Sequence, residues 1–325
     1  MRAVVLGMLL LTVSTTATAA EPYHLIPGGV PLNSGPDGNT VVLDAPKGLI
    51  VFDTGRHSEH AQAIIDYARA RHRPIAAIVN SHWHLDHTSG NWDIRQAYPH
   101  VGVYASGALK GALETFLKDT RAQADQMLAD PKTPAATRDQ LMRGREVIDL
   151  PERIAPNHII AKSGRMSVAG RAIDVHLATF AATEGDVWLY DSKSRTVIAG
   201  DLVVGLVPFM DTACAEGWSK ALGEIARLPF TTLIPGHGDP MTRADFLQWR
   251  TAYDNFVDCG HSTRAGKECV EGWSRDAATF IDAAHAGYAK GAAGYYLQTR
   301  LRSSPAEQQR YCKPLRAATW AKSTR

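Results

Sequence analysis

Several features are missing from this 325-residue sequence, and each absence argues against a class of protein. No long run of like charge occurs and the formal net charge at pH 7 is only +2, so no basic surface for nucleic acid is expected. Repeats of solenoid length and low-complexity tracts are absent, which argues against a repeat array. The Gly-x-Ser-x-Gly motif is also absent, which disfavours a serine hydrolase. We therefore expect a globular protein without a nucleic-acid partner.

Long apolar sequence is scarce and occurs only at the start of the chain. A single arginine, Arg2, precedes an apolar run from Ala3 to Leu11, and small residues lead up to Glu21. The run is shorter than the roughly 18 to 20 residues of a membrane-spanning helix. A basic, then apolar, then small-residue order is typical of a secretory signal peptide. We predict cleavage after Ala20 and a periplasmic or secreted mature protein with no membrane span.

Cysteine is rare and confined to the last third of the chain, at Cys214, Cys259, Cys269 and Cys312. An even number in an exported chain predicts two disulfides, and four cysteines allow three pairings. The short span from Cys259 to Cys269 contains two glycines and is the loop we expect to close. The alternative for Cys214 is a buried free thiol.

Short β-rich runs alternate with helical patterns through much of the chain. In the first half we predict a helix over residues 59–71 and strands over residues 40–43, 48–52, 75–79 and 101–105. In the second half we predict a helix over residues 218–228 and strands over residues 172–178, 187–190, 196–199 and 232–234. This alternation is typical of a layered α/β fold, and two similar halves predict two sheets packed face to face with helices outside.

Two further regions have helical patterns only. Apolar residues recur at helical spacing from residue 109 to 128, and a second helix is expected around residues 137–143, after Pro131 and Pro134. We interpret this region as a helical insertion between the halves. From residue 243 the pattern is helical again, and a further helix is predicted over residues 274–288.

A dense group of metal-binding side chains follows the predicted strand 75–79. The segment reads Asn80-Ser81-His82-Trp83-His84-Leu85-Asp86-His87. Imidazole nitrogen and carboxylate oxygen are ligands of zinc and related divalent ions, and a loop that leaves a strand can bring them to one point. The alternative, a surface loop that is rich in histidine by chance, is weak because the chain has only 13 histidines.

This segment resembles the signature of the metallo-β-lactamase superfamily, and three further pieces follow the family's order between residues 40 and 240. They are the turn Asp53-Thr54-Gly55, the strand end Ile198-Ala199-Gly200-Asp201 and the loop Pro235-Gly236-His237-Gly238. Each piece alone could be an ordinary turn. Together they imply a four-layer αββα sandwich over residues 21–242, after a signal peptide at 1–20 and before a helical C-terminal extension at 243–325.

The resemblance also divides six residues between two metal ions: His82 and His84 for the first, Asp86, His87 and His237 for the second, and Asp201 bridging both. One position departs from the family, because its His-Thr-x-Gly-Asp segment begins here with Ala182. A methyl group cannot bind metal. Glu184 and His176 are nearby alternatives, but His176 lies on an apolar run and reads better as a packed residue. We therefore expect zinc, with one tight ion and a weaker second one.

The activity that the resemblance implies is hydrolysis. A bound metal lowers the pKa of water from about 15.7 to about 7, and Asp86 would orient that water as the catalytic residue. A bridging aspartate at Asp201 resembles the thioesterase, lactonase and phosphodiesterase branches more than the β-lactamases. We expect a small-molecule substrate with an ester, lactone, thioester or amide bond. The alternatives are a β-lactam hydrolase and a non-catalytic periplasmic binding or accessory protein of the same fold.

Overall fold

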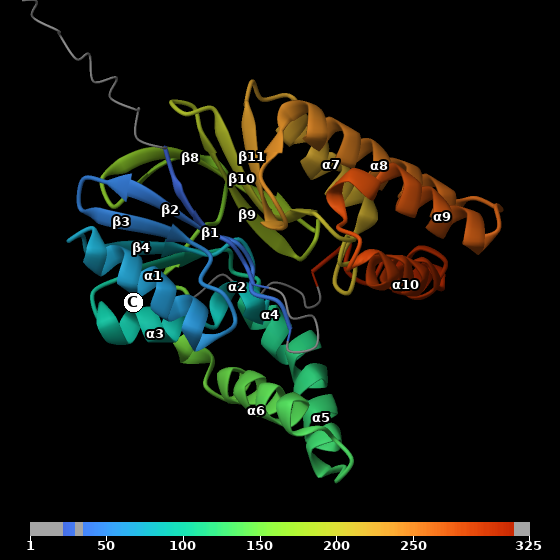
Figure 1. Ribbon diagram of the computed structural model, residues 1–325, viewed down its shortest axis with the longest axis horizontal. Coiled ribbons are helices and arrows are strands. Elements are labelled where there is room, and N and C mark those ends of the chain that lie inside the picture. Colours follow the sequence, from blue (N-terminus) through green and yellow to red (C-terminus); the bar gives the residue numbers. More distant parts are fainter. Residues whose placement is uncertain (1–21, 30–34, 315–325) are drawn as a thin grey trace, which may run out of the picture.

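The strands form two six-stranded sheets in a computed structural model that describes residues 22–29 and 35–314 (Figure 1). The predicted signal peptide lies outside the described residues. The first sheet, in spatial order, contains β1 (His24–Ile26), β2 (Thr40–Ala45), β3 (Gly48–Phe52), β4 (Ile75–Val79), β5 (Gly102–Ala105) and β6 (His158–Ile159). The second contains β12 (Met241–Thr242), β11 (Thr232–His237), β10 (Thr196–Val204), β9 (Gly185–Asp191), β8 (Arg171–Thr179) and β7 (Gly164–Val168). The parallel pairs are β3–β4, β4–β5, β5–β6 and β10–β11.

The two sheets pack face to face, and helices cover their outer faces. Successive side chains of a strand point to opposite faces. Val41 therefore packs between the sheets with Ile198, whereas Val42 packs outward against Ile64. The helices α1 (Ser58–Ala70) and α3 (Asn91–Ala97) lie on the first sheet, and α7 (Ala215–Ala226) and α8 (Arg243–His261) lie on the second. The predicted four-layer sandwich is confirmed.

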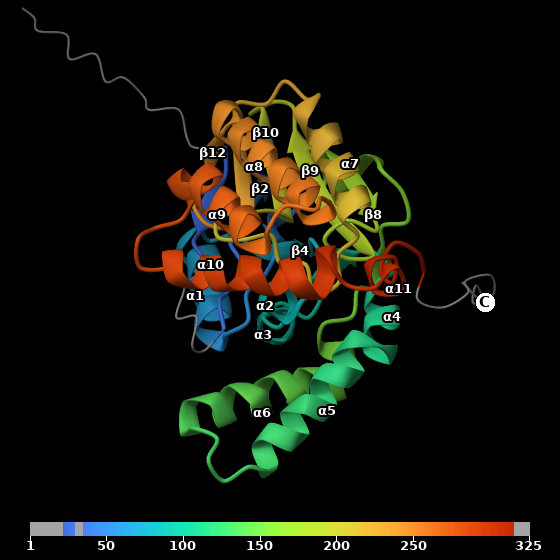
Figure 2. The same cartoon turned by 90° about the vertical axis from the view of Figure 1, so that its right-hand side faces the viewer.

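The predicted insertion is a helical arm between the two halves. It consists of α4 (Leu109–Glu114), α5 (Phe116–Ala129) and α6 (Ala135–Asp149), and α6 is longer than predicted. Figures 1 and 2 show α5 and α6 projecting from the body as a hairpin. The base of the arm packs against the metal-binding segment, because Leu109 and Leu117 share a hydrophobic cluster with Trp83 and Leu85.

Residues 243–314 are mainly helical, and α8 packs on the second sheet with α9 (Gly266–Asp276) against it. This region also contains α10 (Ala286–Tyr296) and α11 (Pro305–Gln308). Thr242 and Asp245 form a capping box at the start of α8. The predicted helix over residues 274–288 is wrong, since α9 ends at Asp276 and α10 begins at Ala286. After α9 the Phe280 amide bonds to the Ala277 carbonyl in a tighter 3-10 turn, and the Asp282 carboxylate accepts the His285 amide at 3.1 Å just ahead of α10, so the α-helical pattern does not continue.

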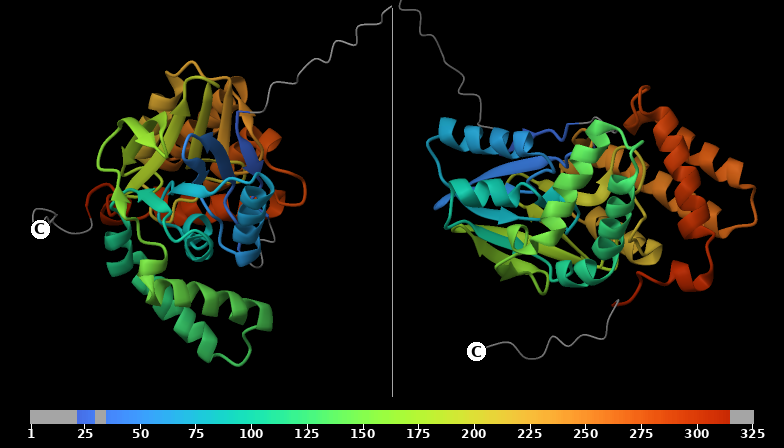
Figure 3. Two further views of the ribbon diagram at one scale, coloured as in Figure 1. Left: turned by 90° about the vertical axis from the view of Figure 1, so that its left-hand side faces the viewer. Right: turned by 90° about the horizontal axis from the view of Figure 1, so that it is seen from below.

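The C-terminal helices lie beside the sandwich, and the insertion extends from a different side (Figure 3, right; helices in orange to red and in green). Two disulfides fix them: Cys259–Cys269, as predicted, and Cys214–Cys312, which spans 98 residues. The free-thiol alternative for Cys214 is therefore wrong. Disulfides are typical of oxidising compartments. Within the part of the chain that the structure describes, no helix is long and apolar enough to cross a membrane.

Candidate metal centre

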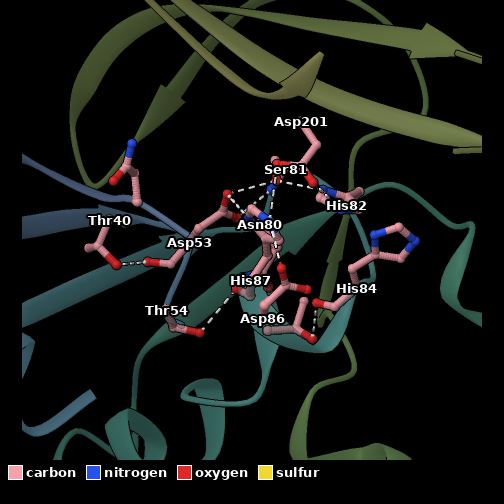
Figure 4. Close-up of polar contacts among 12 residues, drawn as sticks. Thr40, Asp53, Thr54, Asn80, Ser81, His82, His84, Asp86, His87 and Asp201 are labelled. Carbon is pink, nitrogen blue, oxygen red and sulfur yellow. Dashed lines mark hydrogen bonds and ion pairs between the residues drawn. The ribbon is translucent and has the colours of Figure 1, made fainter. Parts of the chain in front are cut away.

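The predicted metal-binding residues come from strand ends in both sheets. In the first sheet, Asp53 follows β3 and the segment 80–87 follows the neighbouring parallel strand β4. In the second sheet, Asp201 lies in β10 and His237 ends the neighbouring parallel strand β11. The sandwich therefore brings the two groups together at one edge, where the short helix α2 (Leu85–Thr88) carries Asp86 and His87 (Figure 4).

Two groups of possible ligands share His87: Asp86, His87 and His237 in one, and His82, His87 and Asp201 in the other. His87 Nε2 lies 3.2 Å from Asp201 Oδ1, 3.3 Å from His237 Nε2 and 3.6 Å from Asp86 Oδ2. His237 Nε2 lies 3.2 Å from Asp86 Oδ2 and 3.5 Å from Asp201 Oδ1. Tetrahedral zinc with bonds of about 2.0–2.1 Å separates its donors by roughly 3.3–3.4 Å. Asp86, His87 and His237 have separations near this value, and Asp201 Oδ1 approaches the two histidines from the neighbouring group. We call these four residues the tight set.

The ring of His87 is held in the tautomer that a ligand requires. Its Nδ1 lies 2.8 Å from Asp53 Oδ2, and the buried carboxylate can only accept, so Nδ1 carries the proton. Nε2 of the neutral ring then has a lone pair, which faces oxygen and nitrogen lone pairs of the tight set. In the metal-free protein the neighbouring carboxylates favour a proton at Nε2, and a bound ion would take the place of that proton.

Ser81 orients the next ligand in the same way. Its hydroxyl donates to Asp53 Oδ2 at 2.7 Å and therefore accepts from His82 Nδ1 at 2.9 Å. His82 Nε2 is left as a buried lone pair without a hydrogen-bond partner among the described residues, as is Asp201 Oδ1. His82 Nε2 lies 3.7 Å from the other oxygen of Asp201, Oδ2. Asp201 thus faces the tight set with one oxygen and His82 with the other.

His84 and Ala182 lie apart from the donor atoms, and the first site is incomplete there. Figure 4 shows the His84 ring directed away from the cluster. Its Nε2 lies 3.5 Å from Thr212 Oγ1, which also donates to the Ala182 carbonyl at 3.3 Å. Of the alternative ligands, Glu184 has its carboxylate against Gly111 in α4, and His176 stacks on Trp188. Neither belongs to a possible metal-binding group among the described residues.

Burial and charge set the protonation of these rings. Burial lowers the pKa of His82 well below its ordinary value and also lowers the pKa of His84, which keeps both rings neutral as ligands. Burial opposes charging of His87, but the carboxylates of Asp201, Asp53 and Asp86 outweigh it and raise the pKa of His87 well above its ordinary value. The cluster thus attracts a cation, and metal uptake there is coupled to proton release.

Two glycines allow the cluster to close. Gly200 has φ of +54°, which favours glycine, and a Cβ there would overlap the side chain of Ser81. A Cβ at Gly236 would overlap Asp201 Oδ1. The glycines in the two motifs of the second half are therefore needed for the ligands to approach.

Sequence reasoning missed Asn39, which joins the two halves. Its side-chain amide donates to the carbonyls of Pro235, at 3.0 Å, and Gly238, at 2.8 Å, on either side of the His237 loop. The side chain is buried. No local pattern distinguishes this asparagine from an ordinary turn residue, because its partners lie about 200 positions away. It positions His237 without touching the cluster.

An open cavity of about 290 Å³ lies over the cluster, between the insertion and the C-terminal extension. Asp86, Asp201 and His84 line it from the metal side. A larger cavity of about 600 Å³ lies beside the Cys214–Cys312 disulfide, but it contains none of the predicted ligands. We therefore place the substrate in the smaller cavity.

Restoring histidine at position 182 is expected to strengthen the weaker site. Ala182→His returns the missing imidazole, so zinc content after dialysis should rise from about one ion toward two, as measured by elemental analysis. Overpacking against Thr212 opposes this gain by about 1 to 3 kcal/mol. Ala181→His, which places the ring one residue earlier, is the matched control and should not add an ion. Equal zinc content in the parent and Ala182→His would contradict the interpretation.

Asp186 is expected to make stability depend on pH. Its carboxylate accepts both the amide and the hydroxyl of Thr183 at 2.9 Å, and burial raises the pKa of Asp186 to about 7. An acid with a raised pKa destabilises the fold as it ionises, so this cost is absent at low pH and complete above pH 7. Between pH 5 and 8 the free energy of unfolding of the parent should fall by on the order of 2 to 3 kcal/mol more than that of Asp186→Asn. Denaturant unfolding checks this, and parallel pH profiles would contradict it.

Comparison with known proteins bears on the family of this chain. The sequence pattern of the metallo-beta-lactamase superfamily matches residues 34–237, which is more than half of the chain. A linear primary-alkylsulfatase from Pseudomonas sp. (strain ATCC 19151) is 24% identical over 224 residues, or 62% of this chain and 41% of the sulfatase. A hydroxyacylglutathione hydrolase from Gloeobacter violaceus is 34% identical over 80 residues, or 22% of this chain and 32% of the hydrolase. The chain thus spans less than half the length of either relative.

Solved structures share the fold at low sequence identity. A double mutant of the sec-alkyl sulfatase PisA1 superposes with a TM-score of 0.54 and 19% identity over 75% of this chain and 42% of the sulfatase. The DIM-1 metallo-beta-lactamase exposed to ceftazidime gives a TM-score of 0.51 and 16% identity over 73% of this chain and 95% of that one. With the ligand motifs, the two sheets and the matching sequence pattern all in agreement, the chain belongs to the metallo-beta-lactamase superfamily.

Proposed function

We propose that this chain is an exported, zinc-dependent hydrolase of a small molecule with an ester, lactone, thioester or amide bond. The observation that carries the proposal is the tight set, two imidazoles and two carboxylates gathered beside an open cavity that Asp86 and Asp201 line. When bound, a divalent ion lowers the pKa of a coordinated water and so supplies a nucleophile at neutral pH. His82 and His84 would belong to a second, weaker site that shares Asp201.

The chain's own residues then orient the reactants. Asp86 has one oxygen in the tight set and the other 3.5 Å from Arg56 at the cavity wall, so it is placed to accept a hydrogen bond from the attacking water. The Arg56 guanidinium supplies positive charge near the negative charge that develops in the reaction. Asp37 fixes this arginine, because its Oδ1 accepts the backbone amides of Arg56 at 2.6 Å and His57 at 2.9 Å.

The choice of bond is supported by the relatives rather than by the cavity alone. They are named as an alkylsulfatase, a hydroxyacylglutathione hydrolase and, in Passalora fulva, an atrochrysone carboxyl ACP thioesterase. Two of these names indicate ester or thioester cleavage, which favours such bonds over a β-lactam. The presence of Asp201 is the feature of this chain that agrees with that preference.

A substrate panel with removal of metal tests the proposed function. Purified mature protein is assayed with 4-nitrophenyl acetate, γ-butyrolactone, acetyl-CoA, an amide, an alkyl sulfate and a chromogenic cephalosporin. We expect turnover of an ester, lactone, thioester or amide that a chelator abolishes and added zinc restores. Preference for the cephalosporin would favour a β-lactamase. Stoichiometric zinc without any turnover would favour the accessory-protein alternative.

Export is expected to produce a mature chain that begins at Glu21 with both disulfides formed. The proposal rests on the signal pattern of residues 1–20 and on the two disulfides. Intact mass spectrometry of protein recovered from the periplasm, under non-reducing conditions, measures both features at once. A full 325-residue chain, or four free thiols, would overturn this part of the proposal.

A further inference from the structure

The cavity over the cluster contains a carboxylate that the hydrolytic chemistry leaves unused. Asp211, in the loop between β10 and α7, lines the same cavity as Asp86 and Asp201 but does not belong to the donor cluster. Its Oδ2 accepts the Tyr296 hydroxyl at 2.7 Å. Its Oδ1 has no hydrogen-bond or ion-pair partner among residues 22–29 and 35–314. Asp211 therefore offers a negative charge to whatever enters.

Aromatic rings form much of the remaining wall. The lining includes Trp83, Phe116, Phe209, Tyr288 and Tyr296. These rings come from three separate parts of the fold: the metal-binding segment with the insertion, the loop before α7, and α10 of the C-terminal extension. The ring centroids of Trp83 and Phe116 lie 5.5 Å apart. Their π faces carry partial negative charge, which attracts cations.

Asp211 lies close to two of these rings, those of Tyr288 and Tyr296. Its negative charge contributes to raising the pKa of both Tyr288 and Tyr296, behind burial, and it also acts on His84. Among the described residues, Arg56 is the one arginine in the cavity lining. Its guanidinium lies 3.5 Å from Asp86, so its charge is paired on the metal side of the cavity. Arg300, which donates to the Ala213 carbonyl at 3.3 Å, also interacts with the charge of Asp211 but does not line the cavity. The wall that faces the cavity around Asp211 is therefore aromatic, with one carboxylate whose charge Arg300 partly offsets.

We propose that this wall binds an ammonium group on an apolar substituent, so that the enzyme prefers substrates that carry a cationic amine beside the bond to be cleaved. The inference rests on the proposed hydrolytic function of the same site. Asp211 and Tyr296 determine specificity, because the hydroxyl fixes the carboxylate and the carboxylate pairs with the cation. An anionic substituent of the same size is repelled at this wall.

A pair of isosteric esters isolates the charge. Acetylcholine carries a trimethylammonium group where 3,3-dimethylbutyl acetate carries a neutral tert-butyl group. We expect kcat/KM to favour the cationic ester by about ten-fold or more in the parent. Asp211→Asn should bring the ratio close to one, mainly through KM, and Tyr296→Phe should reduce it partly. Asp139→Asn, an exposed carboxylate on α6, is the matched control and should keep the parent's ratio.

Binding of phenyltrimethylammonium, measured by calorimetry, separates this inference from the proposed function. Saturable binding that weakens at least about ten-fold in Asp211→Asn supports the binding of an ammonium group at this wall. If such binding is found but neither ester is cleaved, only the hydrolytic proposal fails. Cleavage of both esters at equal rates, with no change in Asp211→Asn, overturns the inference and leaves hydrolysis intact. Thermal unfolding confirms that each variant is folded, and Tyr288→Leu provides a second test that keeps the charge and removes one ring.

Discussion

His237→Ala is expected to abolish hydrolysis and to remove the tightly bound ion. His237 Nε2 lies within 3.5 Å of three other donors of the tight set, so its loss leaves an ion with three protein ligands and an uncovered side. We expect kcat/KM to fall by at least about a thousand-fold, because the loss of the ion removes both the nucleophile and the charge stabilisation. Steady-state kinetics and elemental analysis of dialysed protein measure the two effects.

The control for His237→Ala is His100→Ala, which removes an exposed imidazole in the turn before β5. It should retain the parent's zinc content and rate. If His237→Ala binds as much zinc as the parent and turns over normally, the ligand assignment fails. Loss of rate with full zinc content would instead assign His237 to substrate binding.

Asp53→Asn is expected to weaken metal binding by about 10- to 100-fold although position 53 touches no ion. The Asp53 carboxylate accepts from the Ser81 amide at 2.7 Å, from the Ser81 hydroxyl and from His87 Nδ1. An asparagine has one acceptor oxygen and presents an N–H₂ group to one of these donors. That group favours the other tautomer of His87, with the proton on the nitrogen that should face the ion.

Competition with a chelating indicator measures the zinc affinity of Asp53→Asn. Asp44→Asn, which changes an exposed carboxylate on β2 of the same sheet, provides the control and should match the parent. Unchanged zinc affinity in Asp53→Asn would show that the ring of His87 is fixed by other contacts.

Local sequence predicted the parts of the site that depend on neighbouring residues. His82, Asp86 and His87 follow a buried parallel strand, and a strand end is where a loop can bring such side chains together. Asp201 and His237 required the family resemblance, because each alone is an ordinary turn residue. The αββα layers followed from the spacing of apolar residues, since strands buried on both faces read as continuous apolar runs.

Long-range contacts determine what the sequence did not predict. The orientation of His84 depends on Thr212, which lies 128 positions away. Asp211 reads as a loop residue until the Tyr296 hydroxyl and the aromatic wall are placed beside it. The break between α9 and α10 was missed because the apolar spacing continues through it, whereas the chain forms a 3-10 turn at Ala278–Phe280 and the Asp282 carboxylate accepts an amide just ahead of α10.

Calorimetric titration of zinc into metal-free mature protein measures how many ions each chain binds and how tightly it binds each of them. The tight set contains two imidazoles and two carboxylates, whereas the site proposed at His82 lacks a third imidazole because position 182 is alanine. We predict one high-affinity ion per chain, followed by a second, weaker binding event that is strengthened in Ala182→His. Two equally tight ions in the parent, or no binding of zinc at all, would contradict the account.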